Sequence, residues 1–416
     1  MKSNLMRAEL LATGDELLNG RSVNTHARRL GEALGELGIE LTRETTVRDD
    51  RAEIAAAFRD ALARAPLVFV TGGLGPTCDD LTRDALSDAL GRPIVMDTPS
   101  LERIRARYAV LGRSVNASRE QQALVISGAE VFANSAGAAP GQRLDAPDGR
   151  TVFVLPGPPM EFEAILREHV LPWLRSRRPD ARPRPRALFM VCGPGESDVV
   201  DRLAAAGFDP GPLNLAYCAA PGALEVRLTG APGEEDALER AADRLRTALG
   251  HDVYAESRRD LAEVVGERLI GQSATLATAE SCTGGGLGAR ITATPGASGW
   301  YLGGVIAYSN AVKVRELDVD ELLLAAHGAV SEPVARAMAD GARRRLGADY
   351  AIAITGIAGP AGGTYEKPVG LVWLALADAQ DIIAVSRRFP GDREVVRQWS
   401  VQFALDLLRR RLAGRD

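Results

Sequence analysis

A serine, a cysteine and three glycines stand close together in the segment 279–286 (AESCTGGG). The segment follows a short apolar run and precedes a run with helical spacing, so we expect a tight turn between a strand and a helix. Such a turn leaves backbone N–H groups unpaired, where they can hold an anion or stabilise an oxyanion. The hydroxyl of Ser281 is therefore placed to be a nucleophile, provided that a base lies nearby.

The base is expected to be a lysine rather than a histidine. The chain has four histidines, and none sits in a motif-like setting: His26, His169, His251 and His327. A Ser-Lys pair is then the economical alternative to a Ser-His-Asp triad. Lys313 follows a predicted strand, and an amine can act as a base where desolvation or a nearby positive charge lowers its pKa. The plain alternative is that Lys313 is an exposed surface residue.

Cys282 is a rival nucleophile, because a thiol at a helix N-terminus can have a depressed pKa. On the residues alone, Cys282 and Ser281 are equally suitable. Glu280 is either a general acid or a structural residue. Two further glycine loops, at 295–299 and 355–363, bring more backbone N–H groups to strand ends, which suits a ligand that carries phosphate.

A similar arrangement near the start of the chain predicts a second site. The apolar run 67–71 leads into a loop with three glycines that let a phosphate approach the backbone: Gly72, Gly73 and Gly75. The pair Asp79 and Asp80 would repel phosphate unless a divalent cation bridges them, so the loop predicts a metal-bound diphosphate. The alternative is that one of these aspartates only caps a helix. Loops at 13–19 and 156–161 are expected at the same rim.

Composition limits what these sites can belong to. The chain has 416 residues, a net charge of −5 and a pI of about 5.7, which argue for several domains and against an extended nucleic-acid surface. No apolar run approaches the ~18 residues that a membrane span needs. The four cysteines form no CxxC pair, so neither a zinc site nor a disulfide framework is indicated. We expect a cytoplasmic protein with reduced thiols that does not enter a membrane.

The elements that must position these residues alternate between strands and helices, which predicts parallel α/β sheets covered by helices. In the first part we expect strands at 8–13, 39–47, 67–71 and 152–155, and helices at 23–38 and 51–64. A basic, proline-rich linker at 175–186 precedes a small α+β unit with strands at 188–192, 213–218 and 224–228, and helices from 196 and over 234–249. The last part has strands at 275–278, 304–308, 350–355, 369–377 and 382–388, and a closing helix at 393–412.

The last part resembles the nicotinamide mononucleotide deamidase domain of the CinA family. The matching stretches cover essentially all of residues 261–412 in the family's order: AESCTGG, PGASGWYLGGVIAYSNAVK, GAVSEPVARAMA, TGIAGPAGGTYEKPVGLV and FPGDREVVR. The resemblance implies that Ser281 is the nucleophile and Lys313 its catalytic partner. The implied reaction converts nicotinamide mononucleotide and water to nicotinic acid mononucleotide and ammonia, without a metal or other cofactor.

The same resemblance assigns the remaining residues of this pocket. Tyr308 joins the catalytic set, and Arg393, rather than Arg397, meets the substrate phosphate. The other residues implied to bind substrate are Ser298, Thr355, Thr283, Gly284 and Gly285.

The first part, about 1–170, resembles the molybdopterin-binding fold that molybdenum-cofactor biosynthesis proteins share with the amino-terminal domain of CinA. Those cofactor proteins carry GGTG where this chain has GGLG, and TGDELLNG and GPTCDDLT match the CinA branch more closely. Some members of that branch hydrolyse ADP-ribose to AMP and ribose 5-phosphate with a divalent metal. The resemblance implies Mg²⁺ or Co²⁺ near four carboxylates, with Gly72, Gly73 and Gly75 around the phosphates. The four are Asp15, Glu16, Asp79 and Asp80.

These features predict three domains. They are a molybdopterin-binding-like domain at 1–170, an α+β domain at 186–256 that resembles the KH-like linker of CinA proteins, and an α/β deamidase domain at 257–416. The loop GPGE at 193–196 lacks the basic neighbours that RNA binding needs. The leading hypothesis is a homodimeric enzyme that acts on nicotinamide mononucleotide and ADP-ribose. The alternatives are a non-enzymatic accessory of recombination proteins in competence, or a deamidase whose first domain is vestigial or binds pterin.

Overall fold

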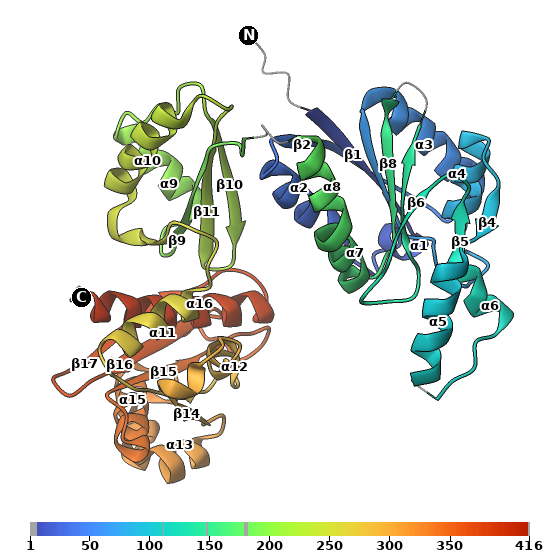
Figure 1. Ribbon diagram of the computed structural model, residues 1–416. Helices are drawn as coiled ribbons and strands as arrows, with labels where there is room; N and C mark the ends of the chain where they lie inside the picture. The colour runs from blue at the N-terminus through green and yellow to red at the C-terminus, as the bar shows by residue number, and fades with distance from the viewer. Residues whose placement is uncertain (1–5, 111, 147–148, 179–181, 415–416) are drawn as a thin grey trace. The chain divides into compact units, whose positions relative to one another are not determined.

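The computed structural model describes residues 6–110, 112–146, 149–178 and 182–414, so residues 179–181 of the predicted linker lie outside it. The chain folds into two compact units, Met1–Arg184 and Pro185–Asp416 (Figure 1). Each unit is built of β-sheets with helices packed on them, which confirms the α/β fold class. None of the helices in the described ranges combines the length and the apolar character that crossing a membrane requires.

The first unit contains a six-stranded sheet in the order β2-β1-β3-β8-β7-β6. Four strands are parallel, as predicted, and β7 and β6 are antiparallel to their neighbours. The sequence analysis did not identify β6 or β7 as strands, so the antiparallel pairing at this edge adds to the predicted parallel sheet. The bounds of the strands are β1 Met6–Thr13, β2 Ile39–Val47, β3 Leu67–Thr71, β6 Glu130–Phe132, β7 Gly141–Asp145 and β8 Thr151–Leu155.

Helices cover both faces of this sheet, which explains why β3 and β8 are buried along their whole length. Val68 and Val70 face a core with α3, whereas Leu67 and Phe69 face a second core with α2, α7 and α8. The helices are α1 Asp15–Leu18, α2 His26–Gly35, α3 Arg51–Arg64, α4 Thr82–Leu90, α5 Thr98–Val110, α6 Ala117–Glu120, α7 Pro159–Ile165 and α8 Leu171–Arg177. A small sheet pairs β4 Ile94–Met96 with β5 Leu124–Ile126.

Helix α2 begins three residues later than predicted. The side chain of Asn24 accepts a hydrogen bond from the backbone N–H of His26 at 2.9 Å, which fixes the turn that precedes the helix. This turn brings the first residue of α2, His26, next to the ends of the central strands.

The second unit contains two sheets. The smaller is antiparallel, in the order β10-β11-β9-β12, and packs on α9 Glu196–Ala205 and α10 Glu235–Leu249 around a core that includes Phe189, Val226 and Leu245. It is the predicted α+β module. Its strands are β9 Arg186–Val191, β10 Asn214–Ala220, β11 Ala223–Thr229 and β12 Val253–Ala255.

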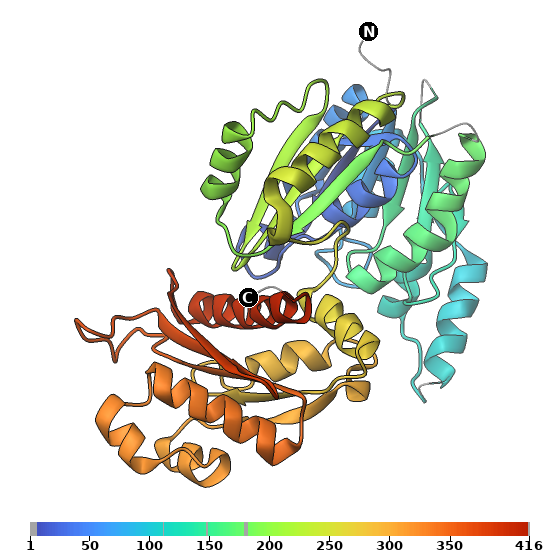
Figure 2. The same ribbon diagram turned by 90° about the vertical axis from the view of Figure 1, so that its left-hand side faces the viewer.

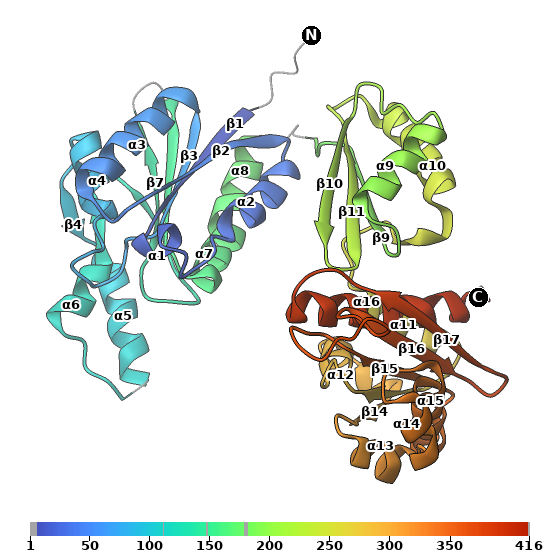
Figure 3. The same cartoon turned by 180° about the vertical axis from the view of Figure 1, so that it is seen from behind.

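The larger sheet of this unit has the order β14-β13-β15-β16-β17, with three parallel strands followed by two antiparallel ones. Its strands are β13 Leu276–Glu280, β14 Tyr301–Ile306, β15 Tyr350–Gly356, β16 Leu371–Ala377 and β17 Ile382–Arg388. Helices α11 Leu261–Gly271, α12 Gly286–Thr292 and α16 Arg393–Leu412 cover one face, and α13 Asn310–Leu317, α14 Glu321–His327 and α15 Glu332–Leu346 cover the other (Figures 2 and 3).

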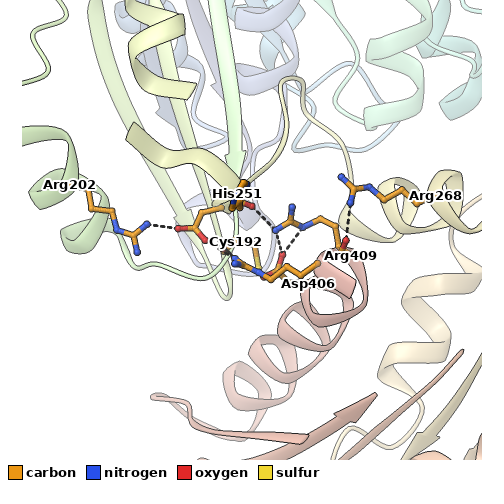
Figure 4. Close-up of polar contacts among 8 residues, drawn as sticks. Cys192, Arg202, His251, Arg268, Asp406 and Arg409 are labelled. Atoms are coloured by element: carbon orange, nitrogen blue, oxygen red, sulfur yellow. Dashed lines mark hydrogen bonds and ion pairs between the residues drawn. The ribbon is translucent and has the colours of Figure 1, made fainter. Parts of the chain in front are cut away.

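A buried ionic network joins α16 to the smaller sheet (Figure 4). Asp406, 2% exposed, accepts hydrogen bonds from the guanidinium groups of Arg409 and Arg410. Arg409 also donates to the carbonyl of His251 at 2.8 Å, and Arg410 donates to the carboxylate of Asp252 at 2.6 Å. Because a buried charge is stable only while it is paired, this network fixes the smaller sheet to the helix that closes the chain.

Candidate active sites

Ser281 is the first residue after β13, at the carboxyl end of the larger sheet of the second unit. Its backbone N–H donates to the carbonyl of Ile354 on β15 at 2.9 Å, which anchors the start of the turn. The Ser281 side chain lies 3.1 Å from the amine of Lys313, measured between Oγ and Nζ, and the residue is 9% exposed. The predicted serine and lysine are therefore in hydrogen-bonding contact.

Lys313 lies on α13, whose first turn is capped by the Ser309 hydroxyl. The residue is only 1% exposed, so the interpretation as a surface lysine is wrong. Its amine donates to the backbone carbonyls of Ala307 at 2.7 Å and Tyr308 at 3.3 Å. Burial lowers the pKa of Lys313, which favours the neutral amine. A neutral amine has two N–H groups for these carbonyls and one lone pair left for the hydroxyl of Ser281.

The carboxylate of Glu280 stabilises the glycine turn by accepting hydrogen bonds from its backbone. Glu280 is 2% exposed and accepts hydrogen bonds from the backbone N–H groups of Gly285, Leu287 and Gly288, at 2.8 to 3.0 Å. The N–H groups at the start of α12 are thus occupied by the protein's own anion. The expectation that the turn leaves backbone N–H groups unpaired is therefore wrong for these three, and Glu280 has the structural role that was one of its two predicted roles.

Cys282 is buried in the core that includes residues of α11 and α16. Burial raises the pKa of the Cys282 thiol to about 12. The expected depression of this pKa by a helix N-terminus is therefore wrong, because desolvation dominates. At neutral pH the group is a protonated thiol, which is a poor nucleophile.

The two arginines at the start of α16 have different partners. Arg393 donates to the phenol oxygen of Tyr308 and to the carbonyl of Gly359, both at 2.9 Å. Arg397 donates to the carbonyl of Thr283 at 2.9 Å and so holds the glycine turn. Tyr308 is 59% exposed, which leaves the Tyr308–Arg393 pair open to a ligand, whereas Arg397 is engaged with the protein.

Two further residues that were predicted to bind substrate, Thr355 and Ser298, have no hydrogen bond to Ser281 or Lys313 in the part of the chain that the structure describes. Thr355, at the end of β15, is buried and donates its hydroxyl hydrogen to the carbonyl of Ala329 at 2.8 Å. Ser298 lies on an exposed turn of 3-10 helix, Ala297–Gly299, and no hydrogen bond of its side chain is found among the described residues. The geometry therefore brings Ser281 and Lys313 together and links Tyr308 to Arg393, and it does not bring Ser298 into contact with them.

The first unit contains a cavity of about 460 Å³ at the carboxyl ends of β1, β3 and β8. Adjacent parallel strands end at the same edge, so the three predicted loops meet there. Its wall includes Gly72, Gly73 and Gly75 together with Glu16 and Asp79. Gly72 has φ of 101°, and a Cβ there would lie 2.4 Å from the carbonyl oxygen of Thr13, so only glycine fits.

Asp80 holds the shape of this glycine loop. Its carboxylate accepts hydrogen bonds from the N–H groups of Gly75 at 2.7 Å and Thr77 at 2.8 Å. The guanidinium of Arg83 also stabilises the loop by donating hydrogen bonds to the carbonyls of Leu74 and Gly75. Helix α4 begins after Leu81 without a side-chain cap, so neither predicted aspartate caps it.

A fourth loop, after β2, adds a carboxylate that the sequence did not reveal. Asp49, just after β2, exchanges backbone-to-carboxylate hydrogen bonds with Asp15, at 3.0 and 3.4 Å. Burial and the charges of Asp15, Glu16 and Asp79 raise the pKa of Asp49. The four carboxylates therefore repel one another. The signal that could have indicated Asp49 is its position directly after a strand.

These carboxylates suit a divalent cation in chemistry, because hard cations prefer oxygen ligands. In the described parts of the chain, however, no three His, Cys, Asp or Glu side chains are close enough together to hold an ion by themselves. Mg²⁺ is commonly bound by one or two carboxylates together with substrate phosphates. The residues fit a cation that is shared with a bound diphosphate, with one or two of Glu16, Asp49 and Asp79 as the protein ligands.

His26 also lines this cavity, although the sequence placed no histidine in a functional setting. It stacks on Phe162 with ring centroids 4.2 Å apart, and its Nδ1 lies 3.3 Å from the hydroxyl oxygen of Thr71. Burial lowers the pKa of His26 to about 4, with a smaller effect from Arg29. The ring is therefore neutral at physiological pH.

Comparison with known proteins assigns both parts of the chain. Residues 258–412 match the family model of the CinA C-terminal domain, and residues 9–176 match that of a probable molybdopterin binding domain. A CinA-like protein of Gemmatimonas aurantiaca is 44% identical over 98% of this chain and 97% of its own length. A putative competence-damage inducible protein of Desulforamulus reducens is 39% identical over 99% of this chain and 100% of its own.

Among solved structures, a CinA superfamily protein of Klebsiella pneumoniae is 41% identical, with a TM-score of 0.36, over 37% of this chain and 96% of that protein.

Proposed function

The chain belongs to the CinA family, and on that premise we propose that its C-terminal part, about 257–416, deamidates nicotinamide mononucleotide with Ser281 as the nucleophile and Lys313 as the base. The observation that carries the proposal is the buried amine of Lys313 at 3.1 Å from the hydroxyl of Ser281. A lysine can serve as a base only when it is neutral, and desolvation lowers the pKa of Lys313 in that direction.

In the proposed reaction, Ser281 Oγ attacks the carboxamide carbon while Lys313 takes the hydroxyl proton. The resulting ammonium of Lys313 returns a proton to the amide nitrogen, the C–N bond breaks, and ammonia leaves. Water then attacks the nicotinoyl ester on Ser281 and gives a proton to Lys313. The Lys313 ammonium returns this proton to Ser281 Oγ as the ester bond breaks, which releases nicotinic acid mononucleotide. In each step the proposed proton carrier is the amine that lies 3.1 Å from Ser281 Oγ.

The substrate phosphate is proposed to bind at Arg393. This guanidinium is tied to Tyr308 and to the loop carbonyl of Gly359, so it is oriented before a ligand arrives. Planar guanidinium groups recognise phosphate through paired hydrogen bonds. Arg397 is assigned a different role, because its guanidinium donates to the carbonyl of Thr283 and so holds the glycine turn.

For the first unit we propose hydrolysis of ADP-ribose to AMP and ribose 5-phosphate. The cavity of about 460 Å³ combines a glycine loop, which suits a diphosphate, with Glu16, Asp49 and Asp79, which suit a divalent cation such as Mg²⁺ or Co²⁺. When bound, the cation would neutralise the diphosphate and activate water. Asp80 acts on the loop rather than on the cation, because its carboxylate is occupied by Gly75 and Thr77.

One experiment separates the two proposed activities. The purified chain is offered nicotinamide mononucleotide and ADP-ribose in separate reactions, the second with Mg²⁺ or Co²⁺, and the products are identified by mass spectrometry. We expect S281A to stop the release of ammonia while AMP formation continues, and D79N to have the opposite effect. Absence of nicotinic acid mononucleotide with the wild-type chain would exclude the deamidase, and absence of AMP with every metal would exclude the pyrophosphatase. Inactivity with both substrates would favour a non-enzymatic role.

A further inference from the structure

The backbone N–H groups of the turn 281–288 are almost all engaged. Glu280 accepts three of them, as described above, and carbonyl groups accept others. Gly284 donates to the carbonyl of Ser281 and Gly286 donates to that of Thr283, both at 3.1 Å. In the described structure, only the N–H groups of Cys282 and Thr283 donate to no other residue of this turn or its surroundings.

These two N–H groups belong to buried residues. Cys282 is 5% exposed and Thr283 is fully buried. The hydroxyl of Thr283 is likewise buried and has no hydrogen-bond partner. Because Thr283 is fully buried, its N–H and its hydroxyl are buried without an acceptor from another described residue. Such donors are destabilising and uncommon, so the pair requires an explanation. An acceptor that is present only during the reaction would provide one.

The position of the Cys282 and Thr283 N–H groups in the chain indicates what that acceptor is. The two N–H groups follow Ser281 directly in the chain, and in serine hydrolases the N–H of the residue after the nucleophile is a recurrent donor to the oxyanion.

We propose that the backbone N–H groups of Cys282 and Thr283 form the oxyanion hole for Ser281, and that Glu280 is the positioning residue that keeps them available. The inference rests on the proposed deamidation and adds the groups that bind its intermediate. When Ser281 Oγ bonds to the carboxamide carbon, the π electrons of the C=O bond move to oxygen, and that oxygen accepts the two hydrogen bonds. When the C–N bond breaks, the electrons return and the leaving nitrogen takes its proton from Lys313.

Glu280 is needed because the turn has competing donors. Its carboxylate occupies the N–H groups of Gly285, Leu287 and Gly288, and this fixes the path of the chain that leads into α12. Arg397 fixes the following peptide, 283–284, through the carbonyl of Thr283.

The direct test deletes one N–H group at a time. In the full-length chain, Thr283 or Cys282 is replaced by its α-hydroxy acid counterpart, which keeps the side chain and exchanges the backbone N–H for an ester oxygen. We expect kcat with nicotinamide mononucleotide to fall about 10²- to 10³-fold at either position, with KM changed by less than about threefold. The matched control is the same exchange at Ala293, whose N–H bonds to the carbonyl of Ala289 at the end of α12, and it should leave kcat within about threefold.

A second readout does not depend on the substrate. Fluorophosphonates phosphonylate activated serines through a charged intermediate, so the rate of labelling of Ser281, followed by intact mass, should fall in the same variants. E280Q should lower kcat at least tenfold without raising KM, whereas a purely structural role would lower only the melting temperature. Ester variants at 282 and 283 that match the Ala293 control in labelling rate would overturn the proposal. A wild-type chain that is labelled at Ser281 but inactive with nicotinamide mononucleotide would instead overturn the proposed substrate.

Discussion

Replacing Lys313 by methionine tests whether its amine is the base. Methionine matches the length of the lysine stem and suits the buried site, which is only 1% exposed. The substitution removes the lone pair that lies 3.1 Å from Ser281 and the donors to the carbonyls of Ala307 and Tyr308. We expect K313M to fold and to lose deamidase activity.

The magnitude follows from these contacts. A positioned general base contributes about 10²- to 10⁴-fold to a rate, so we expect kcat to fall about 10³-fold, equivalent to about 4 kcal/mol in the barrier. Stability should change less. Two carbonyls lose a donor, at about 1 kcal/mol each, but the cost of burying an amine disappears. The free energy of unfolding should stay within about 2 kcal/mol of the wild type.

The assay is ammonia release at saturating nicotinamide mononucleotide, with urea unfolding as the control for stability. The pH dependence gives a second readout. Only the neutral amine can accept a proton, so wild-type kcat should rise with pH and level off below the usual pKa of lysine, because burial lowers the pKa of Lys313. A folded K313M that keeps more than a tenth of the wild-type kcat would refute the assignment of Lys313 as the base.

Three further outcomes follow from the same structure. C282S should keep wild-type kcat, and Cys282 should resist iodoacetamide at pH 8 in intact protein, because burial raises its pKa to about 12; a loss of activity would reinstate the thiol. D406N should lower the free energy of unfolding by about 3 to 5 kcal/mol in a thermal or urea melt, because it leaves Arg409 buried without its partner; an unchanged melt would contradict this. The pKa of His26 is lowered from 6.5 to about 4 in the folded state, so the unfolded chain binds the proton first as pH falls. Between pH 8 and pH 5 the wild type should therefore lose about 2 kcal/mol more stability than H26N; equal losses would show that His26 is not buried as a neutral ring.

The sequence predicted the architecture well where local patterns determine it. The apolar run 67–71 and the closing helix over 393–412 occur at the predicted residues. The prediction of strand positions was less accurate at the edges of the sheets. Strand β14 spans 301–306 rather than 304–308, because the chain leaves the sheet before Ala307, whose carbonyl faces the amine of Lys313. The antiparallel strand β7 was missed because it is only five residues long and mostly polar in sequence, so no apolar pattern indicates that it is largely buried.

The candidate sites show the same division. Residue types and a family resemblance selected Ser281 and Lys313, and the structure brings them into contact. What sequence could not supply is the direction of a side chain and its burial. For this reason Cys282 remained an equal candidate on its residue type alone, and Glu280 kept two roles until its three N–H partners were known. Asp49 and His26 were missed because their place in the cavity wall depends on strands that meet only in three dimensions.

The most direct test of whether Ser281 is the nucleophile is to trap the covalent intermediate on its side chain. The wild-type chain is mixed with nicotinamide mononucleotide, quenched in acid within the first turnover, and digested for mass spectrometry. We expect the peptide with Ser281 to carry the substrate less ammonia, as an ester that disappears in longer reactions and never forms in S281A. An active enzyme in which S281A retains wild-type ammonia release, or in which the adduct is found on Cys282, would contradict it.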